Sequence, residues 1–347
     1  MQTVRVLLAD DSMTARTMMR SILESEGDIR IVGEAKNGVE AVEMTRQIQP
    51  DIVLMDVHMP VMDGIDATKE IMARAPTPIL IVSAATQRDV DLSLSATQAG
   101  ALLALPKPDS PTSPRFEEQR AELVAMVRAL SQVKVVRRWV DERRSRPRAG
   151  RARASGRVQV IAFAASTGGP AALRTVLVGL PSRVGVPIVV VQHIARDFTA
   201  GFARWLGDGL PLPVKLAGRD EPMEPGVVYI APDNTHTGVT ADGTICFSGE
   251  GPIGGFRPSA TYLFASVARA FGADGLGVVL TGMGSDGVQG LLELKRAGGY
   301  VIGQDEQSSI VYGMAQEAAR AGAIDEMLPL DRIAPRLVEL VREGRGR

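Results

Sequence analysis

The feature that most constrains the fold is a repeated alternation of short apolar runs with segments of helical periodicity, which continues from Val4 to about Leu130. Helical stretches separate and follow the apolar runs. The predicted strands are 4–9, 29–32, 52–55, 79–82 and 101–105. Parallel strands need crossover connections, and the intervening helices supply them. We therefore predict a doubly wound parallel sheet, with functional residues at the carboxyl ends of its strands.

A second pattern of this kind begins at Val158 and runs almost to the end of the chain. Its predicted strands are 158–164, 187–191, 227–230, 276–280 and 300–303, and its predicted helices are 170–180, 259–272, 286–297 and 310–321. The Pro- and Gly-rich segment 211–256 favours hairpins and loops, with a strong turn at 241–244. The predicted fold class is α/β, with two doubly wound parallel-sheet domains, the first flavodoxin-like and the second Rossmann-like with three layers.

A strongly basic segment separates the two patterns. Between Lys134 and Arg157 the sequence has ten basic residues against two acidic ones. Such a segment is typical of a solvated connector that buries too little apolar surface to fold, although docking to an acidic partner is the alternative. We predict domains at 1–125 and 157–347, joined by a basic linker at 126–156.

Composition limits the environment of the chain. The formal net charge of −1 gives no overall attraction to nucleic acid or to an anionic membrane. Cys246 is the single cysteine, and the longest apolar runs fall far below the roughly 20 residues that span a bilayer. The amino terminus shows no signal-peptide pattern. We therefore expect a cytoplasmic protein that binds no nucleic acid, is not embedded in a membrane, and is monomeric.

Polar side chains follow four strands of the first pattern. Asp10 and Asp11 come after the first strand, Asp56 after the third, Ser83 ends the fourth, and Lys107 follows the fifth. Clustered carboxylates repel one another unless a cation neutralises them, and an all-oxygen site suits Mg²⁺, which also accepts phosphate oxygens. The sequence thus predicts a phosphate site, whereas either aspartate taken alone would be a helix cap.

Three motifs here resemble the receiver domain of two-component response regulators. They are Leu8-Ala9-Asp10-Asp11-Ser12, Asp56-Val57-His58-Met59-Pro60-Val61-Met62-Asp63-Gly64 and Pro106-Lys107-Pro108. The resemblance implies that Asp56 accepts a phosphoryl group from a histidine kinase. It further implies that Asp11, Asp56 and the backbone carbonyl of His58 bind Mg²⁺, with Asp10 in support.

The same resemblance implies that Ser83 and Lys107 contact the phosphoryl oxygens, and that the Lys107–Pro108 peptide is cis. The sequence departs from the family where Ala104 replaces the usual aromatic switch residue and where Pro106 precedes the lysine. The first departure bears on how phosphorylation is transmitted, and leaves the phosphate chemistry intact.

Ser166 lies at a predicted strand-to-helix turn, in Ala164-Ala165-Ser166-Thr167-Gly168-Gly169-Pro170. There the hydroxyl would project into the crevice while the glycines admit substrate close to the backbone. A phosphate-binding loop and a helix cap by Ser166 or Thr167 are the alternatives.

A base and an acid are available for this serine. His193 follows the strand 187–191, and Asp286 follows the strand 276–280. Ser166, His193 and Asp286 thus have the residue types of a catalytic triad, in which the serine attacks, the histidine takes its proton and the carboxylate orients the histidine. The other histidines of the chain are His58 and His236.

The motifs of the second half resemble the CheB family of chemotaxis protein-glutamate methylesterases. They are Ser166-Thr167-Gly168-Gly169-Pro170, Gln192-His193-Ile194, Phe256-Arg257-Pro258-Ser259 and Gly282-Met283-Gly284-Ser285-Asp286-Gly287. The resemblance implies a triad of Ser166, His193 and Asp286. Thr167 would assist the histidine, and the backbone of Met283 would line the oxyanion site.

The implied activity is hydrolysis of glutamyl γ-methyl esters on methyl-accepting chemoreceptors, together with deamidation of glutamine. It needs no cofactor for the ester chemistry and is raised by phosphorylation of the receiver. A phosphorylation-controlled docking module without hydrolase activity is the alternative. His236 is expected near the site in a structural or substrate role, and Arg257 is expected to bind either an acidic substrate group or a structural carboxylate.

Overall fold

The computed structural model describes residues 3–84, 87–133, 135, 157–196 and 198–343. The chain divides into two compact units, Met1–Arg144 and Ser145–Arg347, and each is described separately. Of the ten basic residues between Lys134 and Arg157, all except Arg157 lie outside the described residues.

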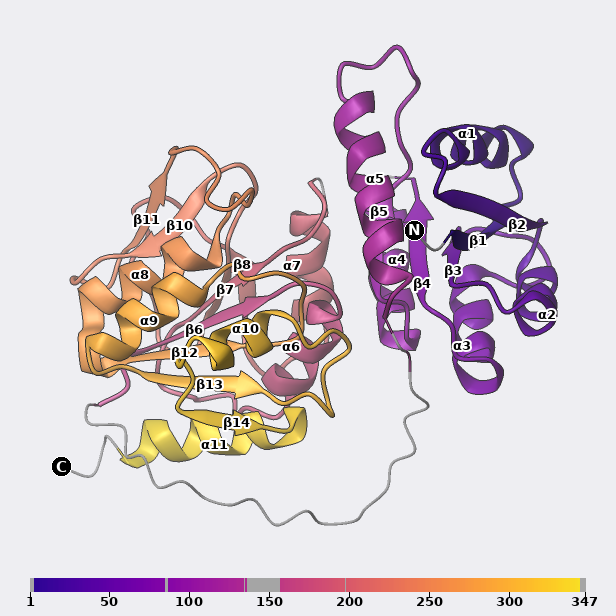
Figure 1. Ribbon diagram of the computed structural model, residues 1–347. Helices are drawn as coiled ribbons and strands as arrows, with labels where there is room; N and C mark the ends of the chain where they lie inside the picture. Colours follow the sequence, from indigo (N-terminus) through magenta and orange to yellow (C-terminus); the bar gives the residue numbers. More distant parts are fainter. Residues whose placement is uncertain (1–2, 85–86, 134, 136–156, 197, 344–347) are drawn as a thin grey trace. The chain divides into compact units, whose positions relative to one another are not determined.

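The first unit is a five-stranded parallel sheet in the order β2-β1-β3-β4-β5. Its strands are β1 (Val4–Ala9), β2 (Ile29–Ala35), β3 (Ile52–Met55), β4 (Ile79–Ser83) and β5 (Leu103–Pro106). Its helices are α1 (Met13–Glu24), α2 (Gly38–Ile48), α3 (Gly64–Arg74), α4 (Gln87–Ala99) and α5 (Phe116–Leu130). Helix α3 contacts α2 and α4, and α1 contacts α5, so the sheet is covered on both faces (Figure 1).

Local sequence signals begin three of these helices. The side chains of Ser12, Asn37 and Asp63 each accept a hydrogen bond from the backbone of the first turn of α1, α2 and α3, respectively. Strands β3 and β4 are buried along their whole length, as expected for central strands covered by helices on both faces. Helix α5 continues to Leu130, so the predicted boundary at residue 125 falls inside this helix.

The second unit is a seven-stranded sheet in the order β14-β13-β12-β6-β7-β9-β8. All its neighbouring strands are parallel. They are β6 (Val160–Ala165), β7 (Ile188–Gln192), β8 (Val214–Leu216), β9 (Val228–Ile230), β12 (Gly275–Val279), β13 (Tyr300–Gln304) and β14 (Glu326–Leu328). A separate antiparallel hairpin joins β10 (His236–Val239) to β11 (Ile245–Ser248).

Helices cover both faces of this sheet (Figure 1). On one face, α9 contacts both α8 and α10, and on the other α6 contacts both α7 and α11. The helices are α6 (Gly169–Val178), α7 (Thr199–Gly207), α8 (Ala260–Phe271), α9 (Val288–Arg296), α10 (Met314–Arg320) and α11 (Leu330–Glu343), with a short 3₁₀ turn at Gly272–Asp274. The apolar sides of α8, α9 and α10 meet the sheet in a core that includes Phe264 and Leu291.

The predicted fold class is confirmed, because both units are parallel sheets between layers of helices. The hairpin turn predicted at 241–244 connects β10 to β11. Sequence periodicity missed β8 and β14, which are three-residue strands at the two edges of the sheet, and the helices α7 and α11. Helix α11 contains Pro335, a residue that usually argues against a helix interior.

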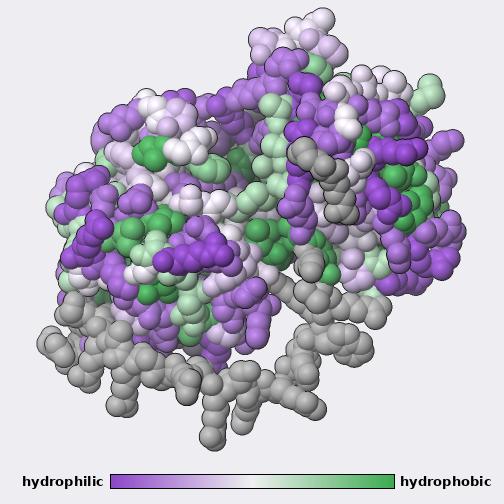
Figure 2. Space-filling view, viewed as in Figure 1, coloured by the Kyte–Doolittle hydropathy of each residue, from purple (hydrophilic) through white to green (hydrophobic). Residues whose placement is uncertain are grey.

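The surface of the described residues is mainly polar. Figure 2 shows polar and charged side chains over most of the visible surface, with apolar patches between them. The exposed large apolar side chains among the described residues are Met13, Val39, Val61, Val178 and Leu216. No helix in the described part of the chain is both long and apolar enough to cross a bilayer.

Candidate functional site

Three carboxylates of the first unit meet where the strand order reverses between β1 and β3. Asp10 and Asp11 follow β1, Asp56 follows β3, and carboxylate oxygens of the three lie within 4.8 Å of one another. Asp10 and Asp56 are buried, whereas Asp11 is exposed. Ligands of open parallel sheets bind at such reversal points, so the acidic cluster lies where the fold favours a site.

A lysine links two of these carboxylates. The Nζ atom of Lys107, which follows β5, lies 2.7 Å from Asp10 Oδ2 and 2.8 Å from Asp56 Oδ2. Burial raises the pKa of Asp56, and the hydrogen bond from Lys107 opposes this only in part. Burial lowers the pKa of Lys107, but its hydrogen bonds to the two aspartates outweigh that effect and raise the pKa overall. The lysine therefore stays charged between its partners.

Ser83 and Gly64 complete this region. Ser83 is fully buried at the end of β4, and its hydroxyl has no hydrogen-bond partner in the described part of the chain. A Cβ atom at Gly64 would lie 2.1 Å from the carbonyl oxygen of Asp56, so only glycine lets α3 begin this close to it. The backbone amide of His58 reaches Asp56 Oδ1 at 3.4 Å.

These residues fit a magnesium ion and a phosphoryl group. Carboxylate oxygens are the ligands that Mg²⁺ prefers, and the cluster offers three of them. The unpartnered Ser83 hydroxyl and the Lys107 ammonium are suitable donors for phosphoryl oxygens. The expectation of a cis Lys107–Pro108 peptide was wrong. The one cis peptide within the described ranges joins Arg257 to Pro258.

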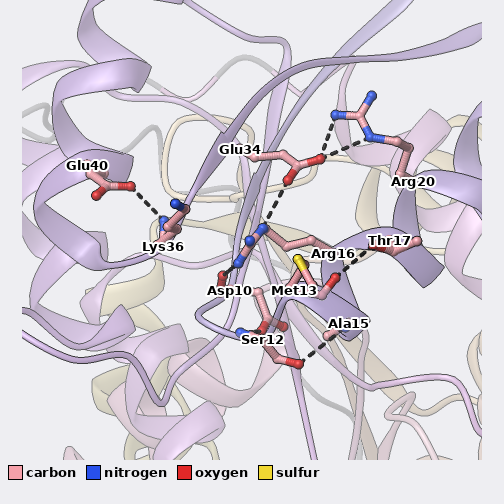
Figure 3. A network of polar contacts seen from close by, with 10 residues as sticks. All are labelled: Asp10, Ser12, Met13, Ala15, Arg16, Thr17, Arg20, Glu34, Lys36 and Glu40. Carbon is pink, nitrogen blue, oxygen red and sulfur yellow. Dashed lines mark hydrogen bonds and ion pairs between the residues drawn. The ribbon is translucent and has the colours of Figure 1, made fainter.

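Sequence reasoning missed an arginine behind the acidic cluster. Figure 3 shows the Arg16 guanidinium between the backbone of Asp10 and the side chain of Glu34. Its Nη1 atom donates to the Asp10 carbonyl at 2.6 Å, and its Nε atom donates to Glu34 Oε2 at 2.9 Å. Arg20 donates to the other oxygen of Glu34 at 2.6 Å. Arg16 is buried, so this network fixes the turn that carries Asp10 and Asp11.

In the second unit, Ser166 and His193 leave neighbouring strands at the same level. Ala165 pairs in register with Gln192, and the His193 amide donates to the Ala165 carbonyl at 2.9 Å. Asp286 lies in the loop between β12 and α9, and β12 pairs with β6 on the side opposite β7. The reversal of strand order at β6 thus brings the three loops to one edge of the sheet.

His193 and Asp286 are joined by a hydrogen bond of 2.9 Å between Nε2 and Oδ2. Since Asp286 is ionised and can only accept, the Nε2 atom donates this hydrogen bond, and in a neutral imidazole Nδ1 then carries the lone pair. Nδ1 is buried and has no partner among the described residues. Ser166 is consequently not hydrogen-bonded to His193 here, and Nδ1 is the ring nitrogen left to receive a serine proton.

The start of helix α8 holds Asp286. The Ser259 hydroxyl donates to Oδ1 at 2.7 Å, the Ala260 amide to Oδ2 at 2.7 Å, and the Thr261 amide to Oδ1 at 3.1 Å. Burial alone would raise the pKa of Asp286, but the hydrogen bonds from His193, Ser259 and Ala260 outweigh it and lower the pKa to about 2. The carboxylate therefore remains charged, and the helix N-terminus favours that charge.

His236 supports this arrangement from behind. It is fully buried, its Nδ1 atom accepts a hydrogen bond from the Ser259 amide at 3.2 Å, and its Nε2 atom lies 3.0 Å from the Gly251 carbonyl. Both ring nitrogens are thus hydrogen-bonded to the backbone, which favours the structural role over the substrate role.

Arg257 has no carboxylate partner in the described ranges, and donates to the Glu250 carbonyl at 3.4 Å.

Thr167 and Met283 lie on the segments that flank Ser166. Thr167 is buried, and its carbonyl accepts a hydrogen bond from the Thr281 hydroxyl at 3.0 Å. Met283 follows Gly282, where a Cβ atom would lie 2.7 Å from the Cβ atom of Ser166. Glycine at 282 therefore lets the segment that carries Met283 approach the serine.

Comparison with known proteins shows the family of this chain. Residues 161–337 match the model of the CheB methylesterase family, and residues 6–113 match that of the response regulator receiver domain. A Myxococcus xanthus protein named protein-glutamate methylesterase/protein-glutamine glutaminase 4 is 46% identical, with 99% of this chain and 98% of that protein aligned. The chain belongs to the CheB methylesterase family.

Two further relatives extend this result. An Anaeromyxobacter dehalogenans protein named protein-glutamate methylesterase/protein-glutamine glutaminase 3 is 47% identical, with 98% of this chain and 99% of that protein aligned. The crystal structure of the Thermotoga maritima CheB methylesterase catalytic domain is 36% identical, covers 53% of this chain and 99% of that domain, and superimposes with a TM-score of 0.52.

Two side chains of the CheB methylesterase domain contact the candidate triad but received no role from the sequence. Phe256 stacks on the His193 ring, and Ser259 donates to Asp286. Both belong to the Phe256-Arg257-Pro258-Ser259 motif. The motif itself was visible, but its contacts with residues 193 and 286 depend on tertiary structure.

Proposed function

We propose that the second unit hydrolyses glutamyl γ-methyl esters on methyl-accepting chemoreceptors, releases methanol, and deamidates glutamine at the same positions. The observation that carries this proposal is the His193 ring, which is bonded through Nε2 to an ionised Asp286 and keeps an unpartnered Nδ1. Ser166 follows the neighbouring strand at the same level. The names of the relatives, protein-glutamate methylesterase/protein-glutamine glutaminase, support the same substrate class.

In the proposed reaction, Ser166 Oγ attacks the γ-carbonyl carbon of the ester while Nδ1 of His193 takes the serine proton. Asp286 holds the ring in this tautomer and stabilises the imidazolium that forms. His193 then returns the proton to the departing methoxide, which leaves as methanol and gives an acyl-enzyme. Water, deprotonated by His193, attacks the acyl carbon, the bond to Ser166 Oγ breaks, and His193 returns the proton to Oγ, which leaves a glutamate side chain and regenerates Ser166.

Two further residues have proposed supporting roles. The backbone amide of Met283 would stabilise the oxyanion, since Gly282 lets this segment approach Ser166. Thr167 would assist the histidine from the turn that follows β6. With a glutamine substrate only the leaving group changes, from methanol to ammonia. The ester chemistry is proposed to need no cofactor, because the side chains supply nucleophile and base and the backbone supplies an oxyanion donor.

We propose that the first unit controls this activity through phosphorylation of Asp56 by a histidine kinase. Asp11, Asp56 and the His58 carbonyl would hold Mg²⁺, with Asp10 in support. The metal, when bound, would offset negative charge at the phosphoacceptor. Ser83 and Lys107 would contact the phosphoryl oxygens; the unpartnered hydroxyl of Ser83 and the charged state of Lys107 support these roles.

The remaining parts of the proposal concern organisation. We propose a receiver domain from residue 1, a basic linker that ends at 156 and a hydrolase domain at 157–347, with the start of the linker moved past Leu130, where α5 ends. The protein would act in the cytoplasm as a monomer, on receptors that present their glutamates there.

Methanol release from methyl-labelled receptor membranes tests the proposal. The full chain is assayed with and without a small phosphodonor plus Mg²⁺, beside Ser166→Ala. We expect release that rises with the phosphodonor and falls by several powers of ten in the variant. Receptor binding without any methanol release from the native chain would favour the docking-module alternative.

A further inference from the structure

Gln192 is the last residue of β7 and precedes His193. Its side chain is buried, with the residue 4% exposed. Its Nε2 atom donates to the Ser166 carbonyl at 2.9 Å and to the His193 carbonyl at 2.7 Å. One amide group therefore joins the backbone of the proposed nucleophile to the backbone of the proposed base.

This link lies just past the end of the strand pairing, where the His193 amide donates to the Ala165 carbonyl and the Ser166 amide donates to the Thr281 carbonyl. The ladder between β6 and β7 ends at the Ala165–Gln192 pair, one residue before Ser166 and His193. The His193 carbonyl accepts no other hydrogen bond from the described residues. Without the Gln192 amide, the His193 carbonyl would lose this partner, and the separation of the two loops would be less constrained.

The orientation of the amide follows from its contacts. A flipped side chain would set its oxygen against two carbonyl oxygens at 2.7 and 2.9 Å, which is repulsive. With Nε2 placed there, the Oε1 atom is buried and lacks a partner among the described residues. A buried acceptor without a donor is unfavourable, so its presence beside the triad needs an explanation.

Gly169 is matched to the same amide. A Cβ atom at Gly169 would lie 2.0 Å from Gln192 Oε1, so any other residue would displace the glutamine side chain. The first turn of α6 thus packs directly against the amide, and glycine at 169 leaves room for it. The turn that carries Ser166 and the side chain of Gln192 are complementary in shape.

We propose that Gln192 is a positioning residue, which sets the separation between Ser166 and His193 by binding both of their carbonyls. The inference rests on the proposed function, because it assumes that these two residues react together. A misplacement of about 1 Å between reacting groups costs about 100-fold in rate. Loss of the amide should therefore slow the chemical step and leave receptor binding unchanged.

The experiment compares the full chain with Gln192→Met, which keeps the length of the side chain and removes both donors, and with Gln192→Glu, which keeps its shape. Tyr229→Phe is the matched control, because it removes a buried hydroxyl that accepts from the Glu224 amide and contacts neither Ser166 nor His193. Three quantities are measured: kcat and KM for methanol release, the rate at which a small phosphonofluoridate labels Ser166, and the urea unfolding midpoint.

For Gln192→Met we expect kcat and the labelling rate to fall by about 10- to 100-fold, with KM within about twofold of the native value. Tyr229→Phe should lower the unfolding midpoint and leave both rates unchanged. A folded Gln192→Met protein with native rates would overturn the proposal. If Gln192→Met does not fold, the same two rates are measured for Gln192→Glu, and native rates in that variant would overturn the proposal. A native chain that neither labels nor releases methanol would refute the proposed function itself.

Discussion

The imidazole of His193 lies parallel to the ring of Phe256, with the ring centroids 4.0 Å apart and the planes 9° apart. The edge of the same imidazole is bonded to Asp286 at 2.9 Å. One partner thus fixes the plane of the ring and the other fixes its rotation in that plane. A base held in this way needs little reorganisation before it takes a proton.

The first prediction concerns this stacking. Phe256→Ala removes the surface against which the His193 ring lies, so the imidazole gains freedom and kcat should fall about tenfold, with a smaller change in KM. Steady-state methanol release measures both constants. Phe256→Tyr retains a ring of the same shape and should stay within about threefold of the native rate. Equal loss in both variants would show that ring stacking is not the relevant property.

The second prediction concerns Asp286. Asp286→Asn removes the charge that fixes the His193 tautomer, and methanol release should fall by about two to four powers of ten. Stability should change with pH as well. The native pKa of about 2 lies below the ordinary value of 3.8, so the ionised carboxylate stabilises the fold above about pH 4, and this contribution is lost as the pH falls towards 2.

Urea unfolding measures this contribution. In a Trp139→Phe background, the fluorescence of Trp205 in α7 reports on the second unit. The difference in unfolding free energy between the chain with the native aspartate and its Asp286→Asn variant should be about 2 kcal/mol at pH 6 and about half as large at pH 3. A difference that grows as the pH falls would contradict the assigned hydrogen bonds.

The third prediction is that Asp56→Asn stabilises the first unit. Burial raises the pKa of Asp56, so its ionised form destabilises the folded state at pH values above that pKa. The neutral asparagine should raise the melting temperature of this unit by a few degrees at pH 7, and the gain should shrink as the pH falls through the raised pKa and be lost below about pH 4. Calorimetry of the full chain measures it. Added Mg²⁺ should raise the native melting temperature more than that of the variant.

The fourth prediction separates Arg16 from Arg20, which share Glu34. Arg16→Met leaves the Asp10 carbonyl without its buried donor and should weaken Mg²⁺ binding about tenfold. Arg20→Met removes the outer contact to Glu34 and should leave Mg²⁺ affinity within about twofold of the native value, because the Asp10 carbonyl keeps its donor. Titration calorimetry with MgCl₂ gives both constants. Equal weakening in the two variants would mean that Glu34, rather than the Asp10 carbonyl, transmits the effect.

The sequence predicted the polar residues that follow strands. Asp10, Asp56, His193 and Asp286 were found because each comes directly after, or shortly after, a buried apolar run, and parallel topology brings such positions to one edge. Edge strands were missed, because β8 and β14 have only three residues each and no measurable period.

The sequence by itself determined the succession of the longer strands and of most helices, and therefore the central strands of both sheets, since periodicity and helix caps act within a few residues. It also determined which chemical groups are available at the strand ends. Only the tertiary structure decided which nitrogen of His193 faces Asp286, that Ser259 and the start of α8 hold this carboxylate, and that Gln192 joins two loops. These contacts join segments distant in sequence, and their geometry follows from packing, on which local sequence patterns carry no information.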